Sequence, residues 1–292
     1  MLPSMRFYII SIVSIFIALG IGIFIGFTID TQNFIIEQKQ NISETIESQF
    51  QILMTENQTL KANENLLKSE NKYKNEYMEL SYEFMTKNKL SGLKIGIIET
   101  NEDYVRSHIS KDLELAGAKV INITTLKNII VDKEKLNNLY KKLDINIPKN
   151  SVETVIRMST ESIISGIPSK IFGYLEEEGF INIAGIYNEA IDYLIICGGS
   201  LNEESKRISQ IDRIIVEVAK EYNIPNLGVE KSDSNYSYIH KYKDLGISTV
   251  DNIDTTMGKV AMVLAMEGMT GNFGTKDTAD SVIPHYNLKI QE

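Results

Sequence analysis

The stretch "RFYIISIVSIFIALGIGIFIGF", from Arg6 to Phe27, decides the architecture of this chain. It belongs to an uncharged run that extends from residue 7 to residue 29. Because an α-helix rises about 1.5 Å per residue, this run is long enough to cross a hydrocarbon core of about 30 Å. A buried helix of a soluble domain is usually shorter and has a polar face. The sequence therefore predicts a membrane-spanning helix over residues 7–29.

A cleaved secretory signal peptide is the alternative for this run. Its apolar region would be short, about 7–15 residues, and small residues would follow at the cleavage site. Here Phe24, Ile25 and Phe27 occupy that place, which favours an uncleaved anchor. Arg6 precedes the run and Asp30 follows it, so the positive-inside rule places the amino terminus in the cytoplasm. We expect a single-pass protein of the cell membrane with the bulk of the chain outside the cytoplasm.

Three small residues share one face of the predicted membrane helix. Ala18, Gly22 and Gly26 are each four residues apart, a spacing that lets two membrane helices approach closely. The pattern is common by chance, so its use for transmembrane association depends on whether the following segment also pairs with a second chain.

Composition limits the function of the 292-residue chain. The formal net charge is −9 and no basic cluster occurs, which argues against nucleic-acid binding. Cys197 is the only cysteine, so an intramolecular disulfide is impossible. The part after the anchor is large enough for one domain of ordinary size and an extended segment.

Residues 30–91 are predicted to form a helical coiled-coil stalk. Residues 31–90 contain neither proline nor glycine and are rich in polar side chains. Apolar residues recur at heptad spacing, and the seam comprises Ile46, Phe50, Leu53, Leu60 and Leu67. A helix this polar cannot bury such a seam alone, so we expect a parallel homodimer. The alternative is one long helix that folds back on its own domain.

The phase of the apolar residues changes beyond Leu67. A second stripe follows at spacings of four, three and four residues, namely Tyr73, Tyr77, Leu80 and Phe84. Such an offset locally changes the supercoil of a coiled coil.

After Gly92, which is expected to end the helix, short β-rich and helical segments alternate. Strands are expected over 93–100, 119–124, 193–199, 224–230 and 246–251, while 181–186 fits a strand or a loop. Helices are expected over 104–118, 132–143, 151–165, 169–179, 203–222 and 254–268, the last capped by Asp254. The pattern predicts an α/β fold, with a mostly parallel open sheet and helices on both faces, Rossmann- or flavodoxin-like.

These patterns divide the chain into five parts. They are a cytoplasmic tail (1–6), a transmembrane anchor (7–29), a coiled-coil stalk (30–91), an extracytoplasmic α/β domain (92–270) and a C-terminal tail (271–292).

Open α/β sheets bind ligands beyond the carboxyl ends of their strands. The first predicted strand ends in "ETNEDY", whose carboxylates would repel a phosphate, and a solvated acidic turn is favoured there over a cation site. The better ligand-binding candidate is "CGGS", because Gly198, Gly199 and Ser200 could present backbone N–H groups to an anion. A tight strand-to-helix turn made possible by glycine is the favoured alternative.

No catalytic constellation emerges from the remaining residues. Cys197 follows an apolar run and is expected to point into the core, and the histidines His108, His240 and His285 are isolated in sequence. No G-x-S-x-G, H-E-x-x-H or C-x-x-C motif occurs. We therefore expect no enzymatic activity and no cofactor.

A methionine stripe raises the question of copper. Met262, Met266 and Met269 lie at helical spacing, with Met257 upstream, and thioethers are ligands that copper(I) prefers. A methionine stripe at this spacing usually packs in a core, and that interpretation is favoured.

The anchor, the segment "YLIICGGS" and the tail "MEGMTGNFGTKDTADSVIP" (266–284) occur in the order seen in a known family. Together they resemble the MctB/SteB-like family of copper-transport outer-membrane proteins, over essentially the whole chain. The resemblance implies a role in copper transport, and copper enters only through it. Other members resemble regulators of cell-wall hydrolases and cell separation that work as dimers. No copper-ligand motif matches residue by residue, so no metal ligand is named.

The residues themselves restrict how such a protein could act. One apolar helix cannot enclose a pore, and the domain lacks the repeated alternating strands of a membrane barrel. We expect a membrane-anchored, dimeric, non-enzymatic envelope protein with a family-implied role in copper transport or homeostasis. The alternative is an envelope scaffold or regulator of peptidoglycan hydrolases. The expected partners are the lipid bilayer, a second copy, and a cell-wall enzyme or other envelope protein.

Overall fold

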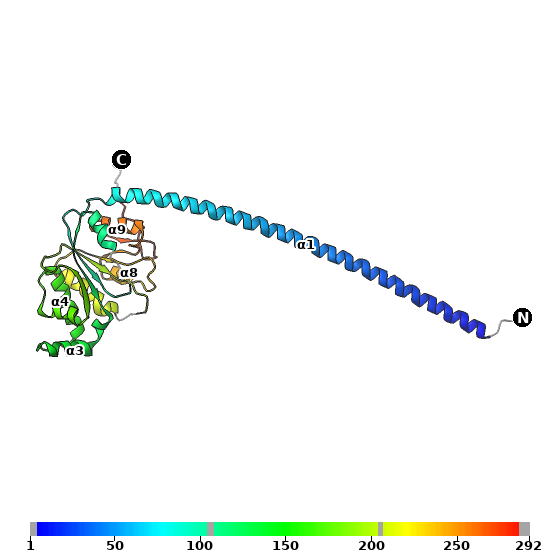
Figure 1. The fold of residues 1–292 in the computed structure, drawn as a ribbon, viewed down its shortest axis with the longest axis horizontal. Coiled ribbons are helices and arrows are strands. Elements are labelled where there is room, and N and C mark those ends of the chain that lie inside the picture. Colours follow the sequence, from blue (N-terminus) through cyan, green and yellow to red (C-terminus); the bar gives the residue numbers. More distant parts are fainter. Residues whose placement is uncertain (1–4, 104–107, 204–206, 286–292) are drawn as a thin grey trace. The chain divides into compact units, whose positions relative to one another are not determined.

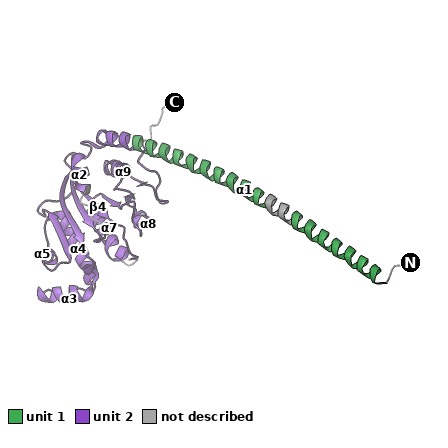
Figure 2. Cartoon of the chain, turned by 45° about the vertical axis from the view of Figure 1, so that its right-hand side comes forward, with its two compact units in different colours: residues 1–74 green, residues 75–292 purple. Residues whose placement is uncertain are grey.

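The computed structural model describes residues 5–103, 108–203 and 207–285, without the side chains of residues 30–37 and 108. The chain forms two compact units, residues 1–74 and residues 75–292, coloured separately in Figure 2. Helix α1 (Met5–Thr86) provides all of the first unit that is described and the first residues of the second. Its segment Met5–Ile29 is long and apolar enough to cross a membrane, a test that a signal sequence also passes.

The second unit is built on a seven-stranded sheet with the order β3-β2-β1-β4-β5-β6-β7. The strands are β1 (Lys94–Glu99), β2 (Lys119–Leu126), β3 (Ile181–Gly185), β4 (Tyr193–Cys197), β5 (Asn226–Val229), β6 (Ser248–Val250) and β7 (Asn272–Phe273). All neighbours pair in parallel except β2 and β3. The predicted α/β class with a mostly parallel sheet is therefore confirmed.

Helices α2 (His108–Leu115), α3 (Lys133–Lys142), α4 (Ser151–Ser165), α5 (Lys170–Glu177), α7 (Arg213–Glu221), α8 (Ile239–Asp244) and α9 (Thr256–Met266) connect the strands. Figure 1 shows the sheet with helices α4 and α9 among those around it. The single turns η1 (Asn128–Val131) and η2 (Ile208–Asp212) complete the described elements. The start of the predicted helix 104–118 and residues 204–206 of the predicted helix 203–222 lie outside the described residues.

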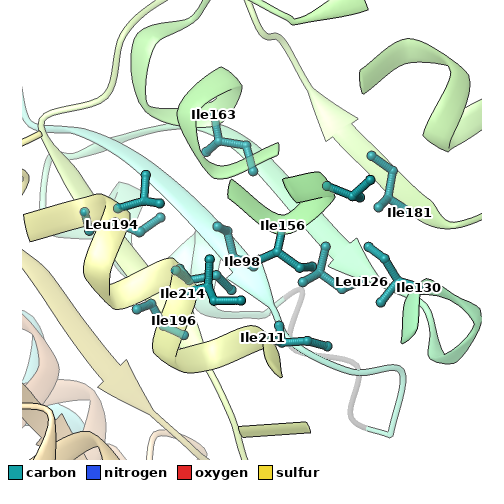
Figure 3. Close-up of a cluster of buried hydrophobic side chains, with 14 of the residues drawn as sticks. Ile98, Leu126, Ile130, Ile156, Ile163, Ile181, Leu194, Ile196, Ile211 and Ile214 are labelled. Atoms are coloured by element: carbon teal, nitrogen blue, oxygen red, sulfur yellow. The ribbon is translucent and has the colours of Figure 1, made fainter. Parts of the chain in front are cut away.

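The central strand β4 explains why helices cover both faces of the sheet. All five of its residues are buried, and in a strand successive side chains point to opposite faces. Leu194 and Ile196 join a core cluster with residues of α4 and α7 (Figure 3), whereas Ile195 and Cys197 join a second cluster with residues of α2 and α9. Burial on both faces stabilises the sheet by roughly 1.5–3 kcal/mol for each large apolar side chain removed from water.

Strand β3 settles the segment that fitted either a strand or a loop. It runs antiparallel to β2 in the register Leu126 to Ile181. Lys127 N–H donates to Phe180 C=O at 3.0 Å. The helical segment between β2 and β3 therefore begins and ends at the same end of the sheet. A chain that returns to the end it left must run back antiparallel.

Two predicted helix boundaries are wrong for local reasons. Helix α1 ends at Thr86 rather than at Gly92, because Asn88 adopts a left-handed conformation (φ 61°) that asparagine tolerates. The N-cap of α9 is Thr255, whose Oγ1 accepts from Gly258 N–H at 3.0 Å. Asp254 instead accepts from Ser232 N–H at 2.7 Å, which ties the loop after β5 to the start of α9.

The last turns of α1 belong to the core of the second unit. Tyr82 is buried against Val260 and Leu264 of α9. Its hydroxyl donates to Asp112 Oδ1 at 3.0 Å, and Lys259 lies 3.3 Å from the same oxygen. This joint fixes residues 75–86 on the face of the sheet that α2 and α9 cover.

A buried asparagine on β2 gives a stability prediction. Asn122 is 1% exposed, and neither polar atom of its side chain has a hydrogen-bond partner among the described residues. We expect Asn122→Leu, which keeps the shape and removes the unsatisfied amide, to raise the free energy of unfolding by about 1 kcal/mol. Urea unfolding of the full chain measures this change.

Thr124 on the same strand is the matched control. It is equally buried, but its hydroxyl is hydrogen-bonded to Tyr187 Oη at 2.7 Å. Thr124→Val should therefore lower stability by about 1 kcal/mol, since the tyrosine hydroxyl loses this partner. If Asn122→Leu destabilised the chain as much as Thr124→Val, the asparagine would not be an unsatisfied group.

Candidate functional site

The chain reverses its direction across the sheet between β1 and β4. From β1 the sheet continues to β2 on one side, and from β4 it continues through β5, β6 and β7 on the other. In open α/β sheets the crevice beyond the strand ends at such a point is the usual ligand site. Glu99–Asn101 follow β1 there and Cys197–Ser200 follow β4, so the structure brings together the two strand ends singled out from the sequence.

Close packing explains the two glycines at the end of β4. A Cβ on Gly198 would lie 2.2 Å from the Tyr242 hydroxyl oxygen. Gly199 has a φ of +80°, and a Cβ there would lie 2.5 Å from Ser234 Oγ. Ser200 is fully buried, and its backbone pairs with Tyr236 in both directions at 2.9–3.0 Å. This geometry favours the tight-turn interpretation, and anion binding by Gly198, Gly199 and Ser200 stays a prediction.

The acidic turn after β1 is fastened to neighbouring loops, whereas the sequence favoured a solvated turn. Glu99 is buried and accepts from the Thr125 hydroxyl at 2.7 Å. Glu102 accepts from Asn128 N–H at 2.9 Å. Asp103 accepts from the Ser200 hydroxyl at 2.7 Å and from Leu201 N–H at 2.8 Å. These carboxylates bind loops of the chain itself, because uncharged donors from β2 and β4 come within reach on folding.

A buried polar cluster next to the crevice was not expected from the sequence. Asp212, the last residue of the π-helical turn η2, is fully buried and accepts from the Tyr242 hydroxyl at 2.5 Å. Arg207 is also buried, and its guanidinium donates to the carbonyls of Thr100 at 2.8 Å and Leu126 at 3.1 Å. Burial raises the pKa of Asp212 to about 6, against the effect of the Tyr242 hydroxyl. A carboxyl group of this kind can hold a proton in mildly acidic conditions.

The C-terminal motif "GNFGTKD" contacts the residues that follow β5 and β6. Asp251, which follows β6, accepts from the backbone N–H groups of Thr275 and Lys276 at 2.8 Å each. The Lys276 ammonium binds the buried carboxylate of Glu230, which also accepts from Ser237 Oγ at 2.5 Å. Side chains of the protein itself therefore occupy the strand ends of β5 and β6.

We call these contacts the C-terminal clasp: Asp251 with the N–H groups of Thr275 and Lys276, and Glu230 with the Lys276 ammonium. The clasp requires glycine at position 274. The φ of Gly274 is +140°, and a Cβ would lie 1.9 Å from Asp251 Oδ1. The tail quoted above for its family signature thus includes β7, the N–H groups that bind Asp251 and the Lys276 ammonium that binds Glu230. Its last residues, from 286 on, lie outside the described residues.

The soft metal ligands lie only partly in the core. Cys197 and Met262 are fully buried and Met266 is 7% exposed, which fits the favoured interpretation. Met269 is only partly buried, and Met257, in the first turn of α9, is 38% exposed. The described residues contain no group of three or more His, Cys, Asp or Glu that could hold a metal ion. His240 is exposed on α8, and the side chain of His108 lies outside the described residues.

The seam residues of α1 are exposed in the single chain. Ile46, Phe50, Leu53, Leu60 and Leu67 are each 58–67% exposed. A Cβ added to Gly22 or Gly26 would have no atom within 4 Å, and Ala18 lies between exposed residues of the same apolar segment. These observations place the association residues on open surface, while association itself stays a prediction.

The second stripe continues this exposure into the second unit. Tyr77, Leu80 and Phe84 are 73%, 80% and 91% exposed. At 100° per residue they lie on the face of α1 opposite to Tyr82 and Thr86, which are buried against the domain. The end of α1 therefore has one face packed on its own domain and one large apolar face without cover among the described residues.

One long helix, apolar over a membrane-length segment and polar after it, and an α/β domain define the class of this chain. The family comparison identifies the group within that class. The family model "Copper transport outer membrane protein, MctB" matches residues 2–284, so the chain belongs to the MctB family. No curated protein matches the chain.

The clasp gives a prediction with an internal control. Gly274→Ala adds both an unfavourable φ and a collision with Asp251, whereas Gly268 has a φ of +118° and open space around its Cβ position. We expect Gly268→Ala to cost roughly 1–2 kcal/mol and Gly274→Ala clearly more, about 3 kcal/mol or above. Equal losses of stability in urea unfolding would show that a Cβ at position 274 meets no additional collision with Asp251.

Asp212 gives a pH prediction. Its folded pKa of about 6 lies above the usual value of about 3.9 for the unfolded chain. Between these values the folded protein holds a proton that the unfolded chain has released, so this group lowers stability as the pH rises from about 4 to about 6, by ~3 kcal/mol. Asp212→Asn removes this cost. The stability difference between variant and parent should grow over that window and stay constant above it.

Asp280→Asn is the control of opposite sign. Hydrogen bonds from Asn272 and Lys243 hold the pKa of Asp280 below its usual value. The stability that Asp280 contributes is present at neutral pH and is lost as the pH falls, so its variant should approach the parent in acid. A pH-independent difference for Asp212→Asn in the same urea titrations would contradict the assignment.

Proposed function

We propose that this member of the MctB family is a single-pass, membrane-anchored homodimer without enzymatic activity of its own, and that it serves the copper transport after which the family is named. In this proposal the amino terminus lies in the cytoplasm, and the stalk and the α/β domain lie outside it. The observation that carries the dimer is the run of exposed apolar side chains on α1, from the seam through Phe84.

The physical argument concerns water-exposed area. Seam residues at heptad spacing are stabilised only when a second helix covers them, because a lone helix leaves them in water. Phe84 and Leu80 are more exposed than the seam residues, although the opposite face of the same helix is buried. A parallel second copy would cover both stripes, with a local change of supercoil between them. The small-residue face of the anchor supports the same parallel arrangement.

Copper would then be handled without a copper site of this chain. Copper(I) prefers thiolate and thioether ligands. Cys197 and Met262 have that chemistry, but both are fully enclosed in the core that packs α9 on the sheet. We propose that the chain contributes structure to a copper-transporting assembly, and that the metal is bound by another component.

The state of the strand-end crevice supports a non-enzymatic role. The strand order 3-2-1-4-5-6 matches that of Rossmann-like folds, although β3 runs antiparallel and β7 extends the sheet, and this order favours the finer assignment. The loop after β1 has no glycine-rich phosphate motif, and its carboxylates bind Thr125, Asn128 and Leu201. The domain is therefore proposed as a rigid binding module rather than a nucleotide enzyme.

An envelope scaffold or regulator of peptidoglycan hydrolases, as in the SteB-like resemblance, is the second candidate. The uncovered face of Tyr77, Leu80 and Phe84 next to the domain favours it, since it offers a large apolar surface for a protein partner.

Deleting the gene in the source cell separates the two roles. The copper role predicts a changed growth threshold in copper with normal cell separation. The regulator role predicts unseparated cells with unchanged copper tolerance. Complementation with the full chain should restore whichever trait is lost. If neither trait changes, both candidates are wrong.

The dimer has its own test in the seam. Leu53→Asp with Leu60→Asp places two charges in the proposed interface, and Gln51→Asp with Gln58→Asp adds the same charges on the opposite face of the helix. We expect the leucine pair to reduce covalent cross-linking between full-length chains in membranes by at least tenfold, and the glutamine pair to leave it nearly unchanged. Equal cross-linking in both variants would rule out the seam.

A further inference from the structure

A cavity of about 440 Å³ lies between the segment η2–α7 and helix α8. Its size falls in the range of about 300–1,000 Å³ that is typical of ligand sites. Ile208 and Leu245 line it from the two helices, and Tyr236 and Tyr238 line it from the loop before α8. Its walls therefore combine branched aliphatic and aromatic surface.

Two features distinguish this cavity from a simple gap in packing. One wall is the π-helical turn Ile208–Asp212, and such turns are rare insertions in α-helices that are frequent at functional sites. The two walls are also joined by the buried hydrogen bond from Tyr242 on α8 to Asp212 on η2. The second carboxylate oxygen of Asp212 is buried and has no hydrogen-bond partner among the described residues. Asp212 therefore joins η2 to α8 although one of its buried oxygens is unsatisfied.

Side chains of both signs line the cavity, and each cation has an acid on its own helix. Arg213 binds Glu217 at 2.5 Å, and Lys241 lies 3.8 Å from Asp244. Glu203 and Asp244 are the acids of the lining. Because the charges of the walls balance, the cavity complements a group without net charge rather than an anion or a cation.

We propose that this cavity binds an uncharged aromatic or branched aliphatic group, carried either by a small molecule or by a side chain of a peptide. The exposed rim fits both sources, since Tyr236 in the lining is 43% exposed, and tyrosine is common where side chains anchor a partner. The site is independent of the proposed dimer and of copper, because it involves neither α1 nor the buried sulfur atoms.

The test uses the full chain in lipid nanodiscs with labelled Ile and Leu methyl groups. Indole is the small-molecule probe, and N-acetyltryptophanamide presents the same ring on an uncharged peptide backbone. We expect saturable shifts of the Ile208 and Leu245 methyl signals, with half-saturation at or below about 1 mM. Saturation by indole alone indicates an enclosed small-molecule site. Saturation by both indicates a site open to a peptide. No saturable shift with either probe overturns the proposal.

Two exposed polar residues provide a matched pair of variants. Ser209→Trp fills this cavity from η2, and Asn138→Trp introduces the same ring at a second cavity lined by Ile129, Leu139 and Phe180. Binding should weaken at least tenfold in the first variant and stay within twofold in the second. If Ser209→Trp does not fold, Asp244→Trp blocks the same cavity from α8. Equal binding in the blocked variant and in Asn138→Trp would place the probe elsewhere and refute the site.

Discussion

The pairing of β1 with β4, buried on both faces, is the constraint on which the rest of the domain depends. Ile95–Glu99 and Tyr193–Cys197 lie side by side in parallel, and nearly every side chain of the two strands is shielded from water. A sheet with two apolar faces requires helices on both, and parallel strands require crossovers. The switch point, the two core clusters and the position of both glycine-containing strand ends all follow from this pair.

The second organising feature is a set of carboxylates that bind donors from other loops of the same chain. Asp103 accepts from Leu201 N–H, and the fully buried Glu230 and Asp251 bind the Lys276 ammonium and Thr275 N–H, all from distant parts of the chain. A buried carboxylate is stable only when its oxygens are satisfied, so these acids fix the loops at the strand ends. These carboxylates and their donors line the strand ends where an open α/β sheet usually binds ligands. A cavity of about 440 Å³ lies between η2–α7 and α8.

The parts of the candidate site that lie at strand ends were predictable from the sequence. The side chains that reach it from distant parts of the chain were not. The spacing of β-rich and helical segments placed "ETNEDY" and "CGGS" at strand ends, which the structure shows to be neighbours, and the apolar context of Cys197 indicated its burial. Tyr242, Ser234 and Asp212 were missed, because no local pattern shows which side chain will fill the space above Gly198 and Gly199. Helix α8 and strand β7 were missed because they are too short for a periodic signal. The C-terminal motif could be recognised as a signature, but only its contacts with Asp251 and Glu230 give it a structural role.

The sequence by itself determined the apolar run long enough for a membrane, the long helix, the α/β class and the membership of the MctB family. These properties depend on composition, periodicity and motifs, which are local and additive along the chain. Only the tertiary structure decided that β3 returns antiparallel, that Thr255 rather than Asp254 caps α9, and that Phe84 is left open while Tyr82 is buried. The direction of β3, the cap of α9 and the exposure of Phe84 depend on contacts between residues far apart in sequence. Packing of the whole domain sets these contacts, and neither residue of a pair does so alone.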